Sequence, residues 1–357
     1  MKQQIDYIIS QLRGYYPDEE LRELAYWVVE EITGLTRAEI LIGCKDTTKN
    51  AHLQEKLLNV PIQSNLECKC AALSERIFGG MRFCAGGVRR YNSFDQCEGV
   101  ACVGKQEKLL NVPIQSNLEV VLQQLRAHVP VQYIFGHTLW NGLDLQVTPA
   151  TLIPRPETAE LVDWVLSRCD KSKPLRVLDI GTGSGCIAIA LKKAAPLWQV
   201  SGLDISQEAL AVAGNNAQRN GVEVRWISAD ILSPLSNSQL PIVDMIISNP
   251  PYICDSERVD MDARVLDYEP HTALFVPDND PLLFYRRIAS LPFAASPCRQ
   301  SSSLRESTER GCYLFFEINE AYGSEVCAML REMGYTNVEL KHDMYGKPRM
   351  VFGEING

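Results

Sequence analysis

The apolar residues of this chain follow two different periods. Near the N-terminus they recur every three or four residues, as on the buried face of an amphipathic helix. The two stripes consist of Ile5, Ile8, Ile9 and Leu12, and of Leu21, Leu24, Ala25, Val28, Val29 and Ile32. Asp18 is a candidate N-cap for the second helix, and Thr36 with Glu39 fits the capping box of a third. The pattern predicts a small helical domain.

Further along, short continuous apolar runs replace the helical stripes. Such runs are typical of buried strands, and helix-like stretches such as 186–193 separate them. The expected strands are residues 175–180, 199–205, 223–230, 242–248 and 311–318. Their alternation with helices predicts a sheet covered by helices. Between the two regions, Asn141-Gly142 predicts a β-hairpin with a type I′ turn.

Residue types that bind ligands follow successive strands. They are Gly181, Gly183 and Gly185 after the first strand, Asp204 and Asp230 at the ends of the next two, and Asn249-Pro250-Pro251-Tyr252 after the fourth. In open α/β sheets, ligands bind outside the carboxyl ends of the strands. The order of these residues therefore predicts one composite site at that edge.

The segment Asn249-Pro250-Pro251-Tyr252 predicts a stiff loop, because each proline fixes its own φ and restricts the residue before it. We expect the Asn249 side chain and the Pro250 carbonyl to accept both hydrogens of a planar –NH2 group, with the Tyr252 ring over that group. The nitrogen lone pair would then face a reagent. The alternative is a structural turn after a buried strand, which the upstream glycine loop makes the weaker interpretation.

The glycine turn and the two acids suit a ligand that contains a nucleoside. The spacing Gly-x-Gly-x-Gly differs from the dinucleotide fingerprint Gly-x-Gly-x-x-Gly, and alone it is a weak signal. Asp204 is placed to bind both hydroxyls of a ribose, or to cap the helix that starts at Ser206. Asp230 is placed to reach an adenine amino group, or to cap a turn.

With these motifs the chain resembles the class I S-adenosylmethionine-dependent methyltransferases, and among them the HemK-type protein-glutamine N5-methyltransferases. Residues 130–136, the hairpin at Asn141-Gly142 and the pre-catalytic segment 147–158 are also similar to that family. The resemblance extends over residues 1–53, 120–295 and 311–357, and it is specific over 130–285.

The resemblance implies an α/β fold of the class I methyltransferase type: a Rossmann-like, mixed seven-stranded sheet with helices on both faces, preceded by a helical domain and a linking β-hairpin. It implies methyl transfer from S-adenosyl-L-methionine to the side-chain amide nitrogen (N5) of the glutamine in the Gly-Gly-Gln motif of class 1 peptide chain release factors. The implied catalytic residues are Asn249, Pro250 and Tyr252, and the substrate-binding residues are Asn249, Pro250, Pro251 and Tyr252. The implied cofactor-binding residues are Gly181, Thr182, Gly183, Ser184, Gly185, Asp204, Asp230, Ile231 and Asn249, and no metal is implied.

We expect three domains or segments. Residues 1–130 form the helical domain, which recognises the protein substrate. Residues 131–155 form the hairpin and pre-catalytic segment, and residues 156–357 form the methyltransferase domain. Two stretches interrupt this order, namely 54–105 and the Ser-rich 296–309, which we interpret as a disordered loop.

The first of these stretches carries a repeat: QEKLLNVPIQSNLE at 54–67 returns unchanged at 106–119. Two identical copies indicate a recent duplication or an assembly error rather than a repeat architecture. The stretch holds Cys68, Cys70, Cys84, Cys97 and Cys102, whose spacing matches no standard zinc site. With no secretion signal, we expect reduced cysteines and a cytoplasmic protein.

The net charge of −9 argues against sequence-independent binding to nucleic acid. It disfavours the runner-up activity, methylation of adenine N6 in DNA or RNA, whose target also presents a planar –NH2 group. A third interpretation is an inactive, methyltransferase-like binding protein, which the intact motifs disfavour. We expect a release factor as partner, no stable nucleic-acid binding and no membrane.

Four further residues near the motifs are candidates for a role in the site. Arg155 and Glu157 organise the entrance of the site, or they form a surface pair. Glu317 ends a buried strand and is a candidate structural acid near the cofactor. Cys254 is a candidate nucleophile, but no histidine lies near it in sequence, so a bystander is the better interpretation.

Overall fold

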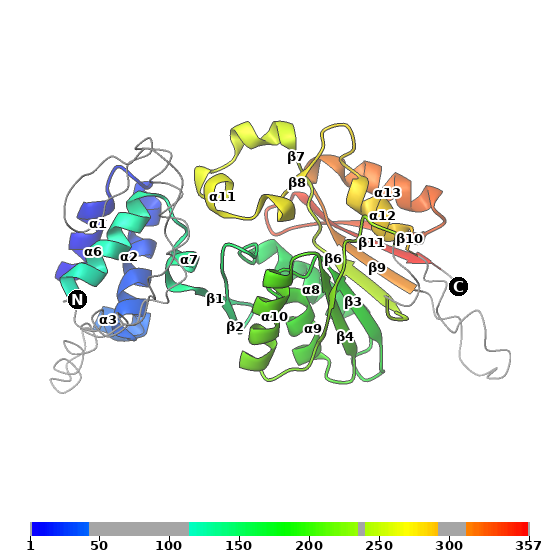
Figure 1. Ribbon diagram of the computed structural model, residues 1–357, viewed down its shortest axis with the longest axis horizontal. Coiled ribbons are helices and arrows are strands. Elements are labelled where there is room, and N and C mark those ends of the chain that lie inside the picture. Colours follow the sequence, from blue (N-terminus) through cyan, green and yellow to red (C-terminus); the bar gives the residue numbers. More distant parts are fainter. Residues whose placement is uncertain (1, 43–113, 235–239, 292–311, 356–357) are drawn as a thin grey trace, which may run out of the picture. The chain divides into compact units, whose positions relative to one another are not determined.

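The computed structural model describes residues 2–42, 114–234, 240–291 and 312–355. The chain divides into two compact units, residues 1–127 and 128–357 (Figure 1). Each unit is described by itself. The duplicated stretch 54–105, with the five cysteines considered as a zinc module, and the Ser-rich stretch 296–309 lie outside the described residues.

The first unit is helical, as the apolar stripes predict. Its helices are α1 (Lys2–Leu12), α2 (Asp18–Thr33), α3 (Arg37–Ile42) and α6 (Ile114–Arg126). The backbone N–H of Thr36 and that of Glu39 each bond the side chain of the other residue, so the predicted capping box is confirmed. The expected cap at Asp18 is wrong, because the N-cap lies one residue earlier. It is Pro17, and Asp18 is the first residue of α2.

In the second unit, a short helix leads into the predicted hairpin. The elements are α7 (Val131–Phe135), β1 (His137–Trp140) and β2 (Leu143–Gln146). Asn141 and Gly142 both have positive φ, 47° and 72°, which confirms the type I′ turn. The hairpin is fixed to α10 (Gln207–Arg219), because the Asn216 side chain bonds both the N–H and the carbonyl of Gln146, at 2.6 and 2.9 Å.

The seven-stranded sheet has the order β10-β11-β9-β6-β3-β4-β5 (Figure 1). The strands are β3 (Arg176–Ile180), β4 (Gln199–Asp204), β5 (Arg225–Ser228), β6 (Met245–Ser248), β9 (Cys312–Glu317), β10 (Thr336–His342) and β11 (Pro348–Ile355). Neighbours from β9 to β5 pair in parallel, whereas β11 pairs antiparallel with both β9 and β10. The mixed sheet confirms the predicted fold class.

Helices cover both faces of this sheet, and each face has its own apolar cluster. Along β3, Val177 belongs to the cluster under α8 (Pro156–Arg168), α9 (Cys186–Ala194) and α10, whereas Leu178 belongs to the cluster under α12 (Leu283–Ala289) and α13 (Gly323–Glu332). The side chains of a strand point alternately to opposite faces. The continuous apolar runs in the sequence therefore reflect burial on both sides.

Smaller elements fill the segment between β6 and α12. They are β7 (Ile253–Cys254), paired in parallel with β8 (Phe275–Val276), the 3-10 helices Asp255–Asp260 and His271–Ala273, and α11 (Ala263–Tyr268); a further 3-10 helix, Glu320–Tyr322, follows β9. Among the described residues, no helix is both long and apolar enough to cross a membrane.

Two glycines that face the same indole ring predict opposite effects on stability. A Cβ on Gly202 in β4 would lie 2.5 Å from the Trp226 ring, whereas one on Gly214 in α10 would lie 3.8 Å from it. Gly202→Ala should therefore lower the free energy of unfolding by about 1–3 kcal/mol through overpacking. Gly214→Ala should raise it by about 0.5–1 kcal/mol, because alanine loses less backbone entropy in a helix. Chemical denaturation of both variants measures the difference, and a loss in both would contradict this packing.

Candidate active site

The pairing of the strands gathers the predicted motifs at one edge of the sheet. Ile180 at the end of β3 lies opposite Ser248 at the end of β6 and opposite Leu203 in β4. The glycine loop, Asp204 and the Asn-Pro-Pro-Tyr segment therefore leave the sheet side by side. An ideal Cβ on Gly181 would lie 3.8 Å from the Asn249 carbonyl oxygen, which shows how closely the two loops approach.

The glycine loop is shaped by backbone conformations that other residues rarely adopt. Gly183 has a φ of 53°, and Gly185, with a φ of 80°, is the N-cap of α9. The N–H of Gly183 donates to Asp204 Oδ2 at 2.8 Å. No atom lies within 4 Å of an ideal Cβ on Gly183, so its backbone is open to the close approach of a ligand.

Asp204 is half-buried and lies between the loop and the next helix. Its Oδ1 accepts the N–H of Ser206 at 2.9 Å, and burial raises the pKa of its carboxyl group. The cap of α10 is Ser206, whose Oγ accepts the N–H of Ala209, so the alternative in which Asp204 caps this helix is wrong. A carboxylate has more lone pairs than its two backbone bonds use, and these remain available to a ligand.

Asp230 serves as a turn cap in the structure. Its two oxygens accept the N–H of Leu232 at 2.9 Å and the Ser233 hydroxyl at 2.7 Å, and these bonds lower the pKa of the carboxyl group. Ile231 is buried, and its carbonyl accepts from Arg287 Nε at 2.7 Å. By contrast, Ile205, directly after Asp204, has 61% of its surface exposed. Because Ile205 lies at the edge where the motifs meet, it is a candidate ligand contact that the sequence did not indicate.

Asp179 is a second residue that the sequence reading missed. It lies inside β3 and is fully buried, and its Oδ2 accepts the Thr182 hydroxyl at 2.5 Å. Within the described residues, its Oδ1 has no hydrogen-bond partner. Burial raises the pKa of this carboxyl group to about 7. The signal in the sequence was an acid inside an otherwise apolar strand, a pattern that favours a functional site.

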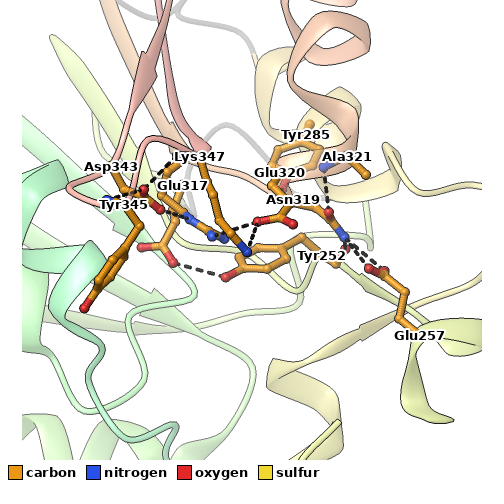
Figure 2. Close-up of polar contacts among 11 residues, drawn as sticks. Tyr252, Glu257, Tyr285, Glu317, Asn319, Glu320, Ala321, Asp343, Tyr345 and Lys347 are labelled. Atoms are coloured by element: carbon orange, nitrogen blue, oxygen red, sulfur yellow. Dashed lines mark hydrogen bonds and ion pairs between the residues drawn. The ribbon is translucent and has the colours of Figure 1, made fainter. Parts of the chain in front are cut away.

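The Asn-Pro-Pro-Tyr segment is tied to a buried carboxylate. Asn249 Nδ2 donates to Thr158 Oγ1 at 3.2 Å, and Thr158 Oγ1 donates to Glu317 Oε2 at 2.6 Å. The Tyr252 hydroxyl donates to the other oxygen, Glu317 Oε1, at 3.2 Å, and Asn319 Nδ2 donates to the Tyr252 carbonyl at 3.1 Å (Figure 2). The end of β9 therefore fixes both the ring and the backbone of Tyr252.

Glu317 has only 1% of its surface exposed. Burial raises the pKa of its carboxyl group to about 7, and the hydroxyls of Thr158 and Tyr252 and the charge of Arg349 oppose this rise. Burial also raises the pKa of Tyr252 above its usual value. Thr158, on α8, had no role in the sequence reading, since a single threonine in a helix gives no signal of a partner on a distant strand.

Arg155 and Glu157 do not form the surface pair that was one of their two interpretations. Arg155 Nη2 bonds Glu269 Oε1 at 2.5 Å, and the Glu269 side chain has 2% exposure. Glu269 Oε2 also accepts the N–H of Ile153 at 3.2 Å, and Trp140 Nε1 donates to the Arg155 carbonyl at 2.7 Å. Glu269 therefore joins the pre-catalytic segment to the polypeptide that follows the Asn-Pro-Pro-Tyr motif.

Cys254, the candidate nucleophile, shows no catalytic arrangement. Cys254 is buried, and burial raises the pKa of its thiol, which favours the unreactive form. Its backbone N–H bonds the Glu257 side chain at 2.6 Å, as in a helix cap. In the part of the chain that the structure describes, no group of His, Cys, Asp and Glu could hold a metal ion.

Known proteins are similar to this chain over about two thirds of its length. Residues 162–266 match the family model described as Methyltransferase small domain. The release factor glutamine methyltransferase of Flavobacterium psychrophilum is 44% identical over 65% of this chain and 78% of that protein. The one of Bacteroides thetaiotaomicron is 43% identical over 68% and 82%. A solved release factor-specific protein-(glutamine-N5) methyltransferase from Alicyclobacillus acidocaldarius is 27% identical, covers 60% of this chain and 100% of that one, and has a TM-score of 0.34.

The pair of Arg155 and Glu269 predicts a loss of stability when the cation is removed. Arg155→Ala should lower the free energy of unfolding by about 1–3 kcal/mol, because it leaves a buried carboxylate without its charge partner. Arg286 forms a matched but exposed pair with Asp280, and Arg286→Ala should change stability by only about 0–1 kcal/mol. Denaturant titration compares the two variants, and equal losses would show that burial of Glu269 has no energetic consequence.

Proposed function

This chain belongs to the release factor glutamine methyltransferase family, and on that premise we propose that it transfers a methyl group from S-adenosyl-L-methionine to the side-chain amide nitrogen (N5) of the glutamine in the Gly-Gly-Gln motif of peptide chain release factors. One observation carries the proposal. Asn249 donates its –NH2 group to Thr158, beside the open glycine loop, so its side-chain oxygen is left to accept from a substrate –NH2 group.

The residues at the edge of the sheet fit the methyl donor. Asp179, buried and bonded to Thr182 of the glycine loop, suits the ammonium of its amino-acid part by charge, and the Asp204 carboxylate suits its ribose hydroxyls. The proposed cofactor-binding residues are Gly181, Thr182, Gly183, Ser184, Gly185, Asp204, Asp230, Ile231 and Asn249, with Asp179 and Ile205 added by their geometry. When bound, the cofactor supplies an electrophilic methyl carbon on a sulfonium.

On the acceptor side, the protein has to make a poor nucleophile reactive. The nitrogen of a carboxamide is unreactive because its lone pair is delocalised into the carbonyl. Hydrogen bonds from its –NH2 group to the Asn249 side-chain oxygen and the Pro250 carbonyl would favour the electron-rich nitrogen of the transition state over the ground state. The Tyr252 ring would cover the amide plane and align it at near-attack distance.

We assign no general base to the proton that leaves the amide nitrogen of the substrate. Thr158 and Tyr252 both donate to Glu317, which is separated from the acceptor by these side chains. We therefore propose that the proton leaves to solvent after methyl transfer.

We assign recognition of the protein substrate to the helical unit together with the hairpin and pre-catalytic segment. A class 1 release factor is the proposed partner, and the cytoplasm, where translation ends, is the proposed location. We propose neither stable nucleic-acid binding nor a membrane role, since the net charge of −9 would repel phosphates and anionic lipids alike.

The first test is Asn249→Ala, assayed with radiolabelled cofactor and a release factor. We expect turnover to fall by about a hundredfold to a thousandfold, because the side-chain acceptor for the substrate amide is lost, a loss of the size seen when one transition-state hydrogen bond is removed. The dissociation constant of the cofactor, from calorimetry, should change by less than about threefold, since an Ala at this position leaves Asp179 and Asp204 in place.

Two further methyl-transfer assays, each with a different candidate substrate, identify the acceptor. A release factor with alanine in place of the motif glutamine should take up no label, and adenine-containing DNA or RNA should take up none. Label in nucleic acid but not in the release factor would overturn the proposal in favour of adenine-N6 methylation. Unchanged turnover of Asn249→Ala would refute the role given to Asn249.

The cofactor site is tested separately with Asp204→Asn. The substitution keeps the shape and one acceptor for the Gly183 and Ser206 N–H groups but removes the charge, so the dissociation constant should rise about tenfold. Asp230→Asn is the matched control, and its effect should be smaller because the hydrogen bonds of Asp230 are exposed to solvent, whereas those of Asp204 are partly buried. Calorimetric titration with the cofactor measures both, and equal affinities for Asp204→Asn and the unmodified protein would contradict the assignment.

A further inference from the structure

The hydrogen bonds from Asn249 through Thr158 to Glu317 have a fixed direction. An ionised carboxylate only accepts, and a hydroxyl has a single proton to donate. Thr158 Oγ1 lies 2.6 Å from Glu317 Oε2, a distance usual for a hydroxyl that donates to a charged oxygen. Thr158 and Glu317 are 2% and 1% exposed, so water does not compete for this proton. The proton of Thr158 is therefore committed to Glu317.

This commitment decides the orientation of the Asn249 amide. With its proton engaged, Thr158 Oγ1 can only accept, and Asn249 must turn its Nδ2 towards it, at 3.2 Å. Its oxygen then lies on the other side of the amide group. If Thr158 could donate instead, the Asn249 amide would be stable with the opposite orientation, and its –NH2 group would occupy the place of the oxygen.

We propose that Glu317 is a positioning residue that sets the polarity of the acceptor site: by binding the Thr158 proton, it makes Asn249 present its oxygen, and not its –NH2 group, to the –NH2 group of the substrate. This inference deepens the proposed function and rests on it. The reversed amide would bring two donors face to face, so the site would reject the acceptor that it otherwise binds.

The same carboxylate acts on the second substrate-binding side chain. Glu317 Oε1 accepts the Tyr252 hydroxyl at 3.2 Å, while Asn319 fixes the Tyr252 carbonyl and itself bonds Glu257 (Figure 2). The two oxygens of Glu317 thus serve the two ends of the Asn-Pro-Pro-Tyr segment. Removal of the Thr158 hydroxyl breaks only one of these two connections, which allows the polarity to be tested without disturbing Tyr252.

The kinetic test compares Thr158→Val with Thr158→Ser at about pH 8.5, above the pKa of about 7 of Glu317. Valine keeps the shape and removes the hydroxyl, and we expect kcat to fall at least about tenfold, the effect of one lost hydrogen bond. The dissociation constant of the cofactor should change by less than about twofold. Serine restores the hydroxyl and should recover most of the lost kcat. Equal rates for valine and serine, or an unchanged kcat with valine, would overturn the proposal.

Glu317→Gln tests whether the carboxylate acts through Thr158. A neutral amide binds the Thr158 proton less firmly, so kcat should fall, and this fall should be smaller when Thr158 is already valine. Additive losses would mean that Glu317 acts independently of Thr158, contrary to the proposal. Thermal unfolding of each variant shows whether it is folded at the assay temperature. If Glu317→Gln is not folded, the comparison of Thr158→Val with Thr158→Ser still tests the proposal.

A measurement without substrate separates this inference from the proposed function. In NMR spectra of the protein alone, the Nδ2 protons of Asn249 should show a nuclear Overhauser effect to the Thr158 side chain, which Glu317→Gln should weaken. Absence of this effect in the unmodified protein would overturn the polarity. If the effect is present but the release factor takes up no methyl group, the proposed substrate is wrong and the polarity of the site stands.

Discussion

The parallel pairing of β3 with β6 is the constraint on which the site depends. It sets Ile180 opposite Ser248, so the glycine loop and Asn249 start from neighbouring points at one edge of the sheet. Polar contacts secure this register: the Ser248 hydroxyl donates to the Ile180 carbonyl at 2.6 Å, and the Arg176 side chain donates to Asp244, just before β6, at 2.6 and 2.9 Å. The two halves of the site inherit their spacing from this pairing.

Beneath this edge the protein keeps two acids away from water. Burial raises the pKa of Asp179 and of Glu317 to about 7, so the ionised forms cost stability. Hydroxyl donors offset part of that cost, from Thr182 for Asp179 and from Thr158 and Tyr252 for Glu317. Apolar side chains of similar volume often give equal or greater stability at buried positions, so the two acids are consistent with a role in orienting the side chains above them.

Much of the fold could be predicted from the sequence, because strands buried on both faces and the Asn141-Gly142 turn leave strong local patterns. The position of the motifs at one edge followed from the same reasoning. The bonds among Asn249, Thr158 and Glu317 could not be predicted, since Thr158 and Glu317 lie 159 residues apart and no local pattern at either residue indicates the other as its partner. The pairing of Arg155 with Glu269 was missed for the same reason, as it joins residues 114 positions apart.

The Asn-Pro-Pro-Tyr segment alone does not distinguish a glutamine from an adenine, because both present a planar –NH2 group. An oxygen presented by Asn249 selects for hydrogen-bond donors and rejects acceptors. It therefore excludes an ester or a carboxylate, but it accepts the –NH2 group of glutamine and that of adenine alike. Discrimination between the two must come from surfaces outside the segment. The acidic chain disfavours a nucleic acid by charge, while the pre-catalytic segment, which Arg155 ties to Glu269, is among the surfaces that we assign to the protein substrate.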